Sequence, residues 1–519
     1  MEALVQSAPP NVSIRARASA AERSPAAERP EFEALIIGAG FGGMGAAIQL
    51  RRLGIESFLI VDRNADVGGT WFSNRYPGLA VDIRSVTYSY SFELNPSWSR
   101  DYAPGTELQA YAQHVAEKYG LREHLRLNCS VERARFDAAR NCWTVFVAEH
   151  EPLTARVLIV ATGYLSQPKW PDVPGLSDFA GKLLHTADWD DSYDLRGRRA
   201  AVIGTGASSV QLLPAIAPQL AQLDVYQRTP IWVAPKRDRE ISPRTRRLFA
   251  RLPILQQSLR ALDGVRLELM VALGLIQYGR APIFSKFAEL GCRRHLARSV
   301  PDRALRKKLT PRYGFGCKRP ALSNDYYRVF TRANVELVTQ AIDRVEPDGI
   351  VTRDGQKRFV DTLVLATGFD VWGGPGRVAV YGRGGVELSE CWKAHGFQAY
   401  AGTTIPGFPN LFYLPSPYSY TGLCYFNTIE GQMRHIARCL VAMQRKRASR
   451  FEVDAAKSAE FLARMRRGLR NSVFVRGTCT GANSYYFDPR GEPSLLRPTT
   501  VWRAHYEHAH FAIDDYHFS

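Results

Sequence analysis

Three glycines near residue 40 have the spacing that binds the phosphates of a dinucleotide. Gly38, Gly40 and Gly43 form a complete GxGxxG pattern within "IIGAGFGGMGAA". Glycine at these positions permits a tight turn, close approach of the backbone to a pyrophosphate, and close packing of the helix that follows. Asp62 ends the next apolar segment, "SFLIVD", where a carboxylate can bind a ribose 2′-hydroxyl. These residues predict a first dinucleotide site.

A second glycine pattern, "VIGTGASS", follows about 160 residues later, with Ser209 where the third glycine or an alanine is usual. The apolar segment after it ends without an acid and continues into "QRTP", which contains Arg228. An arginine at this place suits a 2′-phosphate, so the pattern favours NADP over NAD. The residues expected at this second site are Gly204, Thr205, Gly206, Ser208, Arg228 and Thr229.

Each glycine pattern joins a short apolar strand to a helical pattern, which is the βαβ start of a dinucleotide-binding domain. Two further apolar runs, 157–163 and 362–368, are typical of buried parallel strands. We therefore expect an α/β fold with two Rossmann-like domains, the first interrupted by the second. The expected divisions are a disordered tail at 1–30, the first domain at 31–175, the second domain at 176–316 with a helical insertion at 237–310, and the rest of the first domain with a substrate-pocket region at 317–519. The irregular segment 179–190 is expected to be a connecting loop.

The positive charge of the chain is concentrated in one region. The 519 residues carry a net charge of +18, and residues 236–319 hold 21 Lys or Arg against 6 Asp or Glu. Such a region suits a polyanion, an anionic lipid surface, or simply a solvated helical face. No zinc-finger spacing or RNA-binding aromatic signature accompanies it, so nucleic acid is not expected. We expect this insertion to shape the entrance of the pocket, and leave weak contact with a membrane surface open.

Cysteine usage and the N-terminal segment indicate a cytoplasmic protein. The eight cysteines include no CxxC pair, which favours reduced thiols. The longest apolar run near the middle, "LMVALGLI", is too short to cross a bilayer. Residues 1–30 contain no apolar core of the kind found in a secretion signal.

A set of motifs gives the chain a specific resemblance. Segment 179–190 matches the pattern F-x-G-x-x-x-H-x-x-x-W-[PD], through Phe179, Gly181, His185, Trp189 and Asp190. "GGTWFSNRYPG" (68–78), "VDIRS" (81–85), "QRTP" (227–230), "CKRP" (317–320) and "TLVLATGF" (362–369) stand in the same order as in one family. On these motifs the chain resembles the flavin-dependent monooxygenases of the Baeyer–Villiger type, which are class B flavoprotein monooxygenases.

The resemblance implies the cofactors and the reaction. FAD would bind the first domain and NADPH the second. Reduced flavin would react with O2 to form a C4a-peroxyflavin, and one oxygen atom would be inserted beside the carbonyl of a small ketone, giving an ester or lactone. The sequence gives no oligomeric state, and no metal site is expected.

The resemblance also implies site residues. Arg319 would supply the positive charge that stabilises the peroxide, Asp82 would orient Arg319, and Lys318 would face the 2′-phosphate of NADP. His185 would be a hinge contact that couples domain movement to cofactor position, and Trp189 would anchor its segment. The remaining positions expected to contact FAD are Gly69, Thr70, Trp71, Asp82 and Tyr88.

Other readings remain open at this stage. Segments 411–420 and 478–488 depart from the family pattern, so the substrate is undetermined. Oxygenation of nitrogen or sulfur, and an uncoupled NADPH oxidase, are the enzymatic alternatives; a non-catalytic FAD-binding or membrane-surface protein is another. A disulfide reductase is disfavoured because no redox cysteine pair follows the first glycine pattern. Aromatic residues such as Trp372 and Tyr420 indicate a lipophilic substrate.

Overall fold

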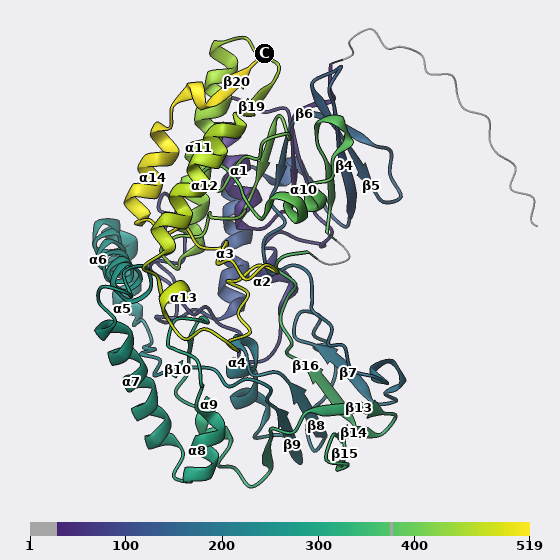
Figure 1. The fold of residues 1–519 in the computed structure, drawn as a ribbon, viewed down its shortest axis with the longest axis vertical. Coiled ribbons are helices and arrows are strands. Elements are labelled where there is room, and N and C mark those ends of the chain that lie inside the picture. Colours follow the sequence, from purple (N-terminus) through teal and green to yellow (C-terminus); the bar gives the residue numbers. More distant parts are fainter. Residues whose placement is uncertain (1–28, 374–376) are drawn as a thin grey trace, which may run out of the picture.

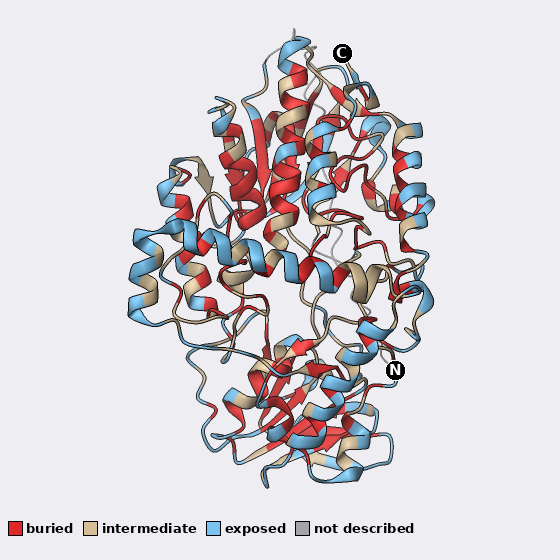
Figure 2. Cartoon of the chain, turned by 90° about the vertical axis from the view of Figure 1, so that its left-hand side faces the viewer, coloured by how far each residue is buried: buried red, intermediate tan, exposed pale blue. Residues whose placement is uncertain are grey.

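The computed structural model describes residues 29–373 and 377–519 (Figure 1). The tail expected at 1–30 lies almost entirely outside these residues. The two glycine patterns open two separate sheets, which occupy the upper and lower halves of Figure 1. Buried residues, red in Figure 2, concentrate in the strands of both sheets and in the helices beside the first. The expected α/β fold with two Rossmann-like domains and a helical insertion is confirmed.

The first sheet has the strand order β17-β4-β5-β6-β1-β2-β3, with β18 paired to β6. Its centre is parallel, because β1 pairs in parallel with both β2 and β6. These central strands are almost wholly apolar and buried, as expected for strands covered on both faces. The strands are β1 (Phe32–Ile37), β2 (Phe58–Val61), β3 (Leu125–Arg126), β4 (Val131–Asp137), β5 (Cys142–Val147), β6 (Leu153–Val160), β17 (Ala379–Tyr381) and β18 (Leu411–Tyr413).

Helices cover the first sheet and build the C-terminal part of its domain. Helix α1 (Phe41–Arg52) follows the first glycine loop and packs closely on α11 (Tyr425–Arg445), where Gly45 faces Ile429. A short pair of antiparallel strands, β19 (Phe451–Val453) and β20 (Tyr516–Phe518), closes the C-terminus. The other helices here are α2 (Thr70–Ser73), α3 (Gly105–Lys118), α10 (Leu388–His395), α12 (Ala455–Leu469), α13 (Val473–Arg476) and α14 (Val501–His510).

The second sheet is fully parallel, with the order β12-β9-β8-β16-β7. Its strands are β7 (Lys182–His185), β8 (Arg199–Ile203), β9 (Gln222–Tyr226), β12 (Val335–Val338) and β16 (Thr362–Leu365). Helix α4 (Ala207–Ile216) follows the second glycine loop, and α9 (Tyr326–Val329) packs near it. A small antiparallel sheet of β13 (Ile342–Glu346), β14 (Gly349–Thr352) and β15 (Lys357–Phe359) is attached, and β10 (Val233–Ala234) pairs with β11 (Ala321–Leu322).

Two expectations about this part of the chain are wrong. Strands β12 and β16 belong to the second sheet, although both lie in the stretch 317–519 that was expected to rejoin the first domain. The apolar run of β16 could serve either sheet, and only its pairing with β8 and β7 decides the matter. Segment 179–190 is not a loop throughout, because Lys182–His185 forms the edge strand β7. A four-residue edge strand is too short to show a period.

The basic region is helical, as expected. It contains α5 (Pro243–Arg251), α6 (Pro253–Val271), a π-helical turn (Ala272–Ile276), α7 (Ile283–Ser299) and α8 (Arg303–Leu309). Side chains at two helix N-termini accept backbone N–H groups: Ser242 from Thr245, and Asp302 from Ala304 and Leu305. Among the described residues, no helix is long and apolar enough to cross a membrane.

Two chain segments connect the sheets, and they lie side by side. One follows β6 and the other follows β16. The backbone N–H of Lys169 donates to Gly368 over 2.8 Å, and that of Asp370 donates to Gln167 over 2.9 Å. Pro168 and Phe369 form an antiparallel bridge between these two bonds. Any rotation of one domain against the other must therefore bend this paired connection.

Candidate active site

A cavity of about 1790 Å³ lies between the two sheets. It is lined by loops that follow strands of both domains, as expected for ligands that bind beyond the carboxyl ends of parallel strands. Predicted residues that line it are Gly38, Gly40, Asp62, Gly69, Thr70, Trp71, Asp82, Tyr88, Gly204, Thr205, Gly206, Ser208, Arg228, Thr229, Lys318 and Arg319. Gly43 and His185 do not line it. No residue of 237–310 lines it either, so the insertion does not shape this cavity.

The first glycine loop is shaped by close backbone contacts. Gly38 has φ +109°, and a Cβ there would lie 2.5 Å from the carbonyl oxygen of Ala161 on the neighbouring strand end. A Cβ on Gly43 would lie 1.8 Å from the carbonyl oxygen of Gly38, so only glycine lets α1 sit this close to β1. Gly40 caps α1 without a side-chain bond and lines the cavity. The N–H groups of this helix end are thus available to a phosphate.

Asp62 directly follows β2 and is buried. Its carboxylate accepts the N–H of Ala39 over 2.6 Å and that of Asn64 over 2.8 Å. Burial raises the pKa of Asp62 despite the opposing effect of these bonds. The side chain also borders the cavity beside the glycine loop, a position from which it can reach a ribose hydroxyl.

The second glycine loop repeats the first with one substitution. Gly204 has φ +115°, and its Cβ would lie 2.4 Å from the carbonyl oxygen of Ala366. Ser209, in place of a third glycine, donates its hydroxyl to the carbonyl of Gly204 over 2.7 Å. Helix α4 and strand β8 therefore remain close, because this hydrogen bond takes the place of the close backbone contact that Gly43 allows in the first loop. A Cβ on Gly206 would meet no atom within 4 Å, and Gly206 lines the cavity, so the loop has space for a bound phosphate group.

Two cations line the cavity beside this second loop. Lys318 and Arg228 have no hydrogen bond or ion pair to their side chains within the described ranges, although Lys318 is half-buried and Arg228 exposed. Burial, and to a lesser degree the charge of Arg228, lowers the pKa of Lys318. Two like charges held together without a counter-charge fit an anion such as a 2′-phosphate.

Arg319 is fixed on two sides. Its Nε donates to Asp82 Oδ2 over 2.7 Å and its Nη2 to Asp82 Oδ1 over 2.8 Å, which is a bidentate pair. Its Nη1 donates to the hydroxyl of Tyr420 over 3.0 Å. Burial opposes the charge on both partners, but their mutual attraction outweighs it, so the pKa of Asp82 falls and that of Arg319 rises. The guanidinium is therefore a permanent charge at the cavity wall, and donors remain beyond the three already used.

Tyr420 is a site residue whose role could not be recognised from the sequence, where it counted only as an aromatic side chain. Its hydroxyl donates to the carbonyl of Leu423 over 2.7 Å. Because a phenol has one proton, this bond leaves its lone pairs for Arg319. Tyr420 lies in the segment 411–420 that departs from the family pattern, and no local signal links it to a residue 101 positions away.

The expected flavin-side residues lie together at the first domain. Thr70 begins the short helix α2, which Gly69 precedes with φ +57°. Trp71 meets Tyr88 edge to face, with ring centroids 5.7 Å apart. Tyr88 meets Phe426 of α11 in the same way at 5.0 Å. Trp71 and Tyr88 line the cavity, as does Asp82, whereas Phe426 packs on Tyr88 outside the lining.

His185 lies at the interdomain connection rather than at the cavity. It is buried at the end of β7, where its Nδ1 accepts the N–H of Ala187 over 3.0 Å. Its ring lies 5.7 Å from that of Trp170 on one connecting segment, and its Nε2 lies 3.4 Å from the Thr367 hydroxyl on the other. Burial lowers the pKa of His185, so the ring is neutral at pH 7. The ring thus touches both segments that join the domains.

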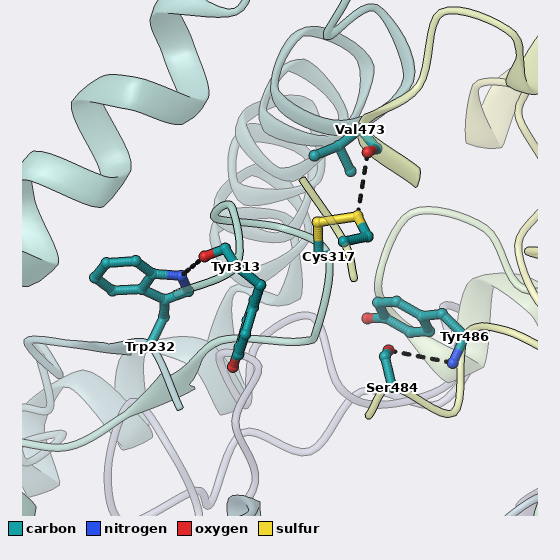
Figure 3. Close-up of a disulfide and its surroundings, with 7 residues drawn as sticks. Trp232, Tyr313, Cys317, Val473, Ser484 and Tyr486 are labelled. Atoms are coloured by element: carbon teal, nitrogen blue, oxygen red, sulfur yellow. Dashed lines mark hydrogen bonds between the residues drawn. A yellow bond between two sulfur atoms is a disulfide. The ribbon is translucent and has the colours of Figure 1, made fainter. Parts of the chain in front are cut away.

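The C-terminal segment 478–488 joins the two domains over the cavity. The side-chain amide of Asn483 donates to the Thr229 hydroxyl over 2.8 Å, and Trp372 Nε1 donates to the carbonyl of Tyr485 over 2.9 Å. Cys479 forms a disulfide with Cys317, which directly precedes Lys318 and Arg319 (Figure 3). The expectation that all cysteines are reduced is therefore wrong for this pair. A pairing across 162 residues has no local signature.

Comparison with known proteins assigns the family. Residues 35–267 match the family model described as pyridine nucleotide-disulphide oxidoreductase. The chain is 38% identical over 515 residues to a Baeyer-Villiger monooxygenase of Pseudomonas aeruginosa, an alignment that covers 98% of this chain and 96% of that protein. The solved structure of cyclohexanone monooxygenase from Rhodococcus sp. Phi1 bound to NADP+ matches with a TM-score of 0.83 and 27% identity, over 94% of this chain and 99% of that one. OTEMO in complex with FAD and NADP matches with a TM-score of 0.83 and 26% identity, over 95% of this chain and 100% of that one. The two glycine loops and the Arg319–Asp82 pair agree with this similarity, which extends over nearly the full length of the chain. The chain belongs to the Baeyer–Villiger monooxygenase family.

Proposed function

We propose that the cavity between the two domains carries out oxygen insertion next to the carbonyl of an apolar ketone, with Arg319 as the catalytic charge. The chain is an NADPH-dependent flavoprotein monooxygenase that uses FAD, and its product is an ester or lactone. The observation that carries the assignment of Arg319 is its position: a guanidinium held by Asp82 and Tyr420 at the wall shared by both nucleotide loops.

The residues that line the cavity form two groups, one for each cofactor. Bound FAD supplies the redox chemistry that activates O2. The first glycine loop, Asp62, Gly69 and Thr70 would hold it, with Trp71 and Tyr88 as the aromatic wall. The second loop, Arg228, Thr229 and Lys318 would hold NADPH. Arg319 stabilises negative charge that develops on oxygen, because a fixed cation in a partly dry cavity acts far more strongly than one in water.

The substrate is proposed to be apolar because aromatic side chains from several segments border the cavity near Arg319, namely Trp372, Tyr420, Tyr485 and Phe487. The direct test is to compare NADPH consumption with ester formation for cyclic, aromatic and long-chain ketones. The purified protein should be yellow, bleach with NADPH and regain its colour in air. Oxygenation of amines or sulfides without any ester would instead indicate a heteroatom oxygenase, and hydrogen peroxide as the sole product would indicate an oxidase.

We propose that His185 is a positioning residue at the hinge. His185→Ala removes contacts to both connecting segments while leaving the cavity wall intact. The ester formed per NADPH consumed should fall by about tenfold, whereas NADPH oxidation persists, because domain movement rather than chemistry is disturbed. His395→Ala, an exposed histidine on α10, is the control and should leave the ratio unchanged. Equal loss of NADPH oxidation and ester formation in His185→Ala would contradict a hinge role.

We propose that Tyr420 positions Arg319. Tyr420→Phe keeps the ring but removes the hydroxyl that accepts from Arg319 Nη1. A hydrogen bond to a charged group contributes about 1.5–3 kcal/mol, so ester formation should slow by roughly tenfold or more. The KM for NADPH should stay the same, because Tyr420 does not belong to the second glycine loop. Tyr413→Phe, whose ring packs on Trp392 outside the cavity lining, is the matched control.

A further inference from the structure

Helix α6 of the basic insertion buries three polar side chains against the protein and exposes a row of leucines. Gln256, 2% exposed, donates to a backbone carbonyl of the first domain over 2.8 Å. Asp263 accepts the hydroxyl of Thr87 over 2.8 Å, and Glu268 accepts a backbone N–H over 3.0 Å. On an amphipathic helix of a globular protein, such a row of leucines normally faces the interior. The inner face of α6 therefore combines these hydrogen bonds with the packing of two buried apolar side chains, Leu267 and Val271.

The outer faces of α6 and α7 carry large exposed apolar side chains. On α6, Leu255, Leu259, Leu262 and Leu269 recur three, four or seven residues apart and so share one side of the helix. Leu262 is 68% exposed, and Phe287 on α7 is 65% exposed. Figure 2 views the molecule from the side on which α5, α6 and α7 lie, and pale blue marks their exposed residues. A gathering of exposed apolar residues on neighbouring helices indicates an interaction surface.

The same surface is cationic. Residues 243–299 contain nine exposed Arg or Lys, of which Arg244, Arg247 and Arg251 lie on α5. Two of the nine are paired with acids, Arg266 with Asp263 over 3.5 Å and Arg293 with Glu289 over 2.9 Å. The third acid of this range, Glu268, is buried, so the other seven cations have no ion pair among the described residues. The surface therefore combines apolar side chains with uncompensated positive charge.

The exposed apolar side chains and the positive charge together indicate which kind of partner this surface binds. In a two-fold dimer through this face, each cationic surface would meet a copy of itself, and like charges would repel. An anionic bilayer offers both a negative headgroup layer and an apolar interior. We propose that the outer face of α5, α6 and α7, here called the docking face, binds the enzyme to an anionic lipid surface. Leucine and phenylalanine side chains of α6 and α7 enter the boundary between headgroups and acyl chains, while the arginines contact the headgroups.

The proposal is independent of the reaction assigned to the cavity, because none of these residues lines it. The test uses the full-length FAD-bound protein in flotation with vesicles of phosphatidylcholine alone or with about one third phosphatidylglycerol. The unmodified protein should float with the anionic vesicles and not with the neutral ones. Raising the salt concentration should weaken binding, because it screens the headgroup charge.

Two variants separate the apolar and the cationic contributions. Leu262→Asp with Phe287→Asp should lower the partition coefficient by at least about tenfold, because apolar insertion is lost. Arg247→Glu with Arg251→Glu should lower it by more than about 25-fold, since each contacting cation contributes roughly fivefold. Matched controls lie away from the docking face: Val386→Asp, 51% exposed in the parent, and Arg353→Glu, also exposed. Yellow colour and unchanged NADPH oxidation verify that each variant is folded.

Several results would overturn the proposal. Absence of binding to anionic vesicles at low salt would reject it outright. Equal binding to neutral and anionic vesicles would show that the cations do not contribute to binding. Unchanged binding of the Leu262→Asp/Phe287→Asp variant would show that the apolar side chains do not contribute. A parent protein that is dimeric by light scattering, becomes monomeric in that double variant and ignores vesicles would show that a second copy covers the docking face instead.

Discussion

Replacing Arg319 by alanine is expected to yield a folded, yellow protein that makes almost no ester. The first glycine loop and α2 do not depend on this side chain, so FAD should still bind. The guanidinium is the cation held by the Asp82 carboxylate at the cavity wall, at 2.7 and 2.8 Å. Loss of one such stabilising donor typically costs about 10²–10³ in rate, and loss of the whole charge costs at least as much. Ester formation and NADPH consumption, measured in parallel, check the prediction.

Removing Arg319 also leaves the carboxylate of Asp82 without its partner. Arg319→Ala combined with Asp82→Asn separates the two effects, because the double variant has neither charge. We expect the double variant to remain inactive, since a neutral pair cannot stabilise an oxyanion. Arg319→Lys should recover only part of the activity, because an ammonium cannot bind Asp82 in a bidentate manner and Tyr420 as well. Ester formation at a near-normal rate in Arg319→Ala would refute the assigned mechanism.

Replacing Arg228 or Lys318 by alanine is expected to raise the KM for NADPH by roughly ten- to hundredfold. Each side chain would lose a charge-assisted contact to the 2′-phosphate, worth about 1.5–3 kcal/mol. The KM for NADH should hardly change, because NADH has no such phosphate. Steady-state kinetics with both cofactors provide the measurement.

The double variant tests whether the two cations act on one group. Arg228 contributes to the lowered pKa of Lys318, so removal of either cation relieves repulsion on the other. The loss of NADPH affinity in the double variant should therefore exceed the sum of the two single losses. Arg198→Ala, which changes an exposed residue directly before β8, serves as the control. Equal catalytic efficiency with NADH and NADPH in the unmodified protein would contradict a 2′-phosphate site here.

The sequence by itself determined the features that depend on local spacing. The two glycine patterns predicted two dinucleotide domains, because the turn, the phosphate contact and the helix packing all fall within a few residues of one another. The basic charge between 236 and 319 predicted an exposed helical insertion. Resemblance to a family, rather than any local pattern, brought Arg319 and Asp82 together, since 237 residues separate them.

The tertiary structure alone decided the contacts between distant segments. Strand β16 could have joined either sheet, because a buried parallel strand is apolar on both faces in either one. The Tyr420–Arg319 bond, the Cys317–Cys479 disulfide and the contact of His185 with both connecting segments depend on where separate loops meet. The outward position of the leucine row on α6 was hidden for the same reason. A periodic pattern shows that a helix has two faces, but only its neighbours determine which face lies inside.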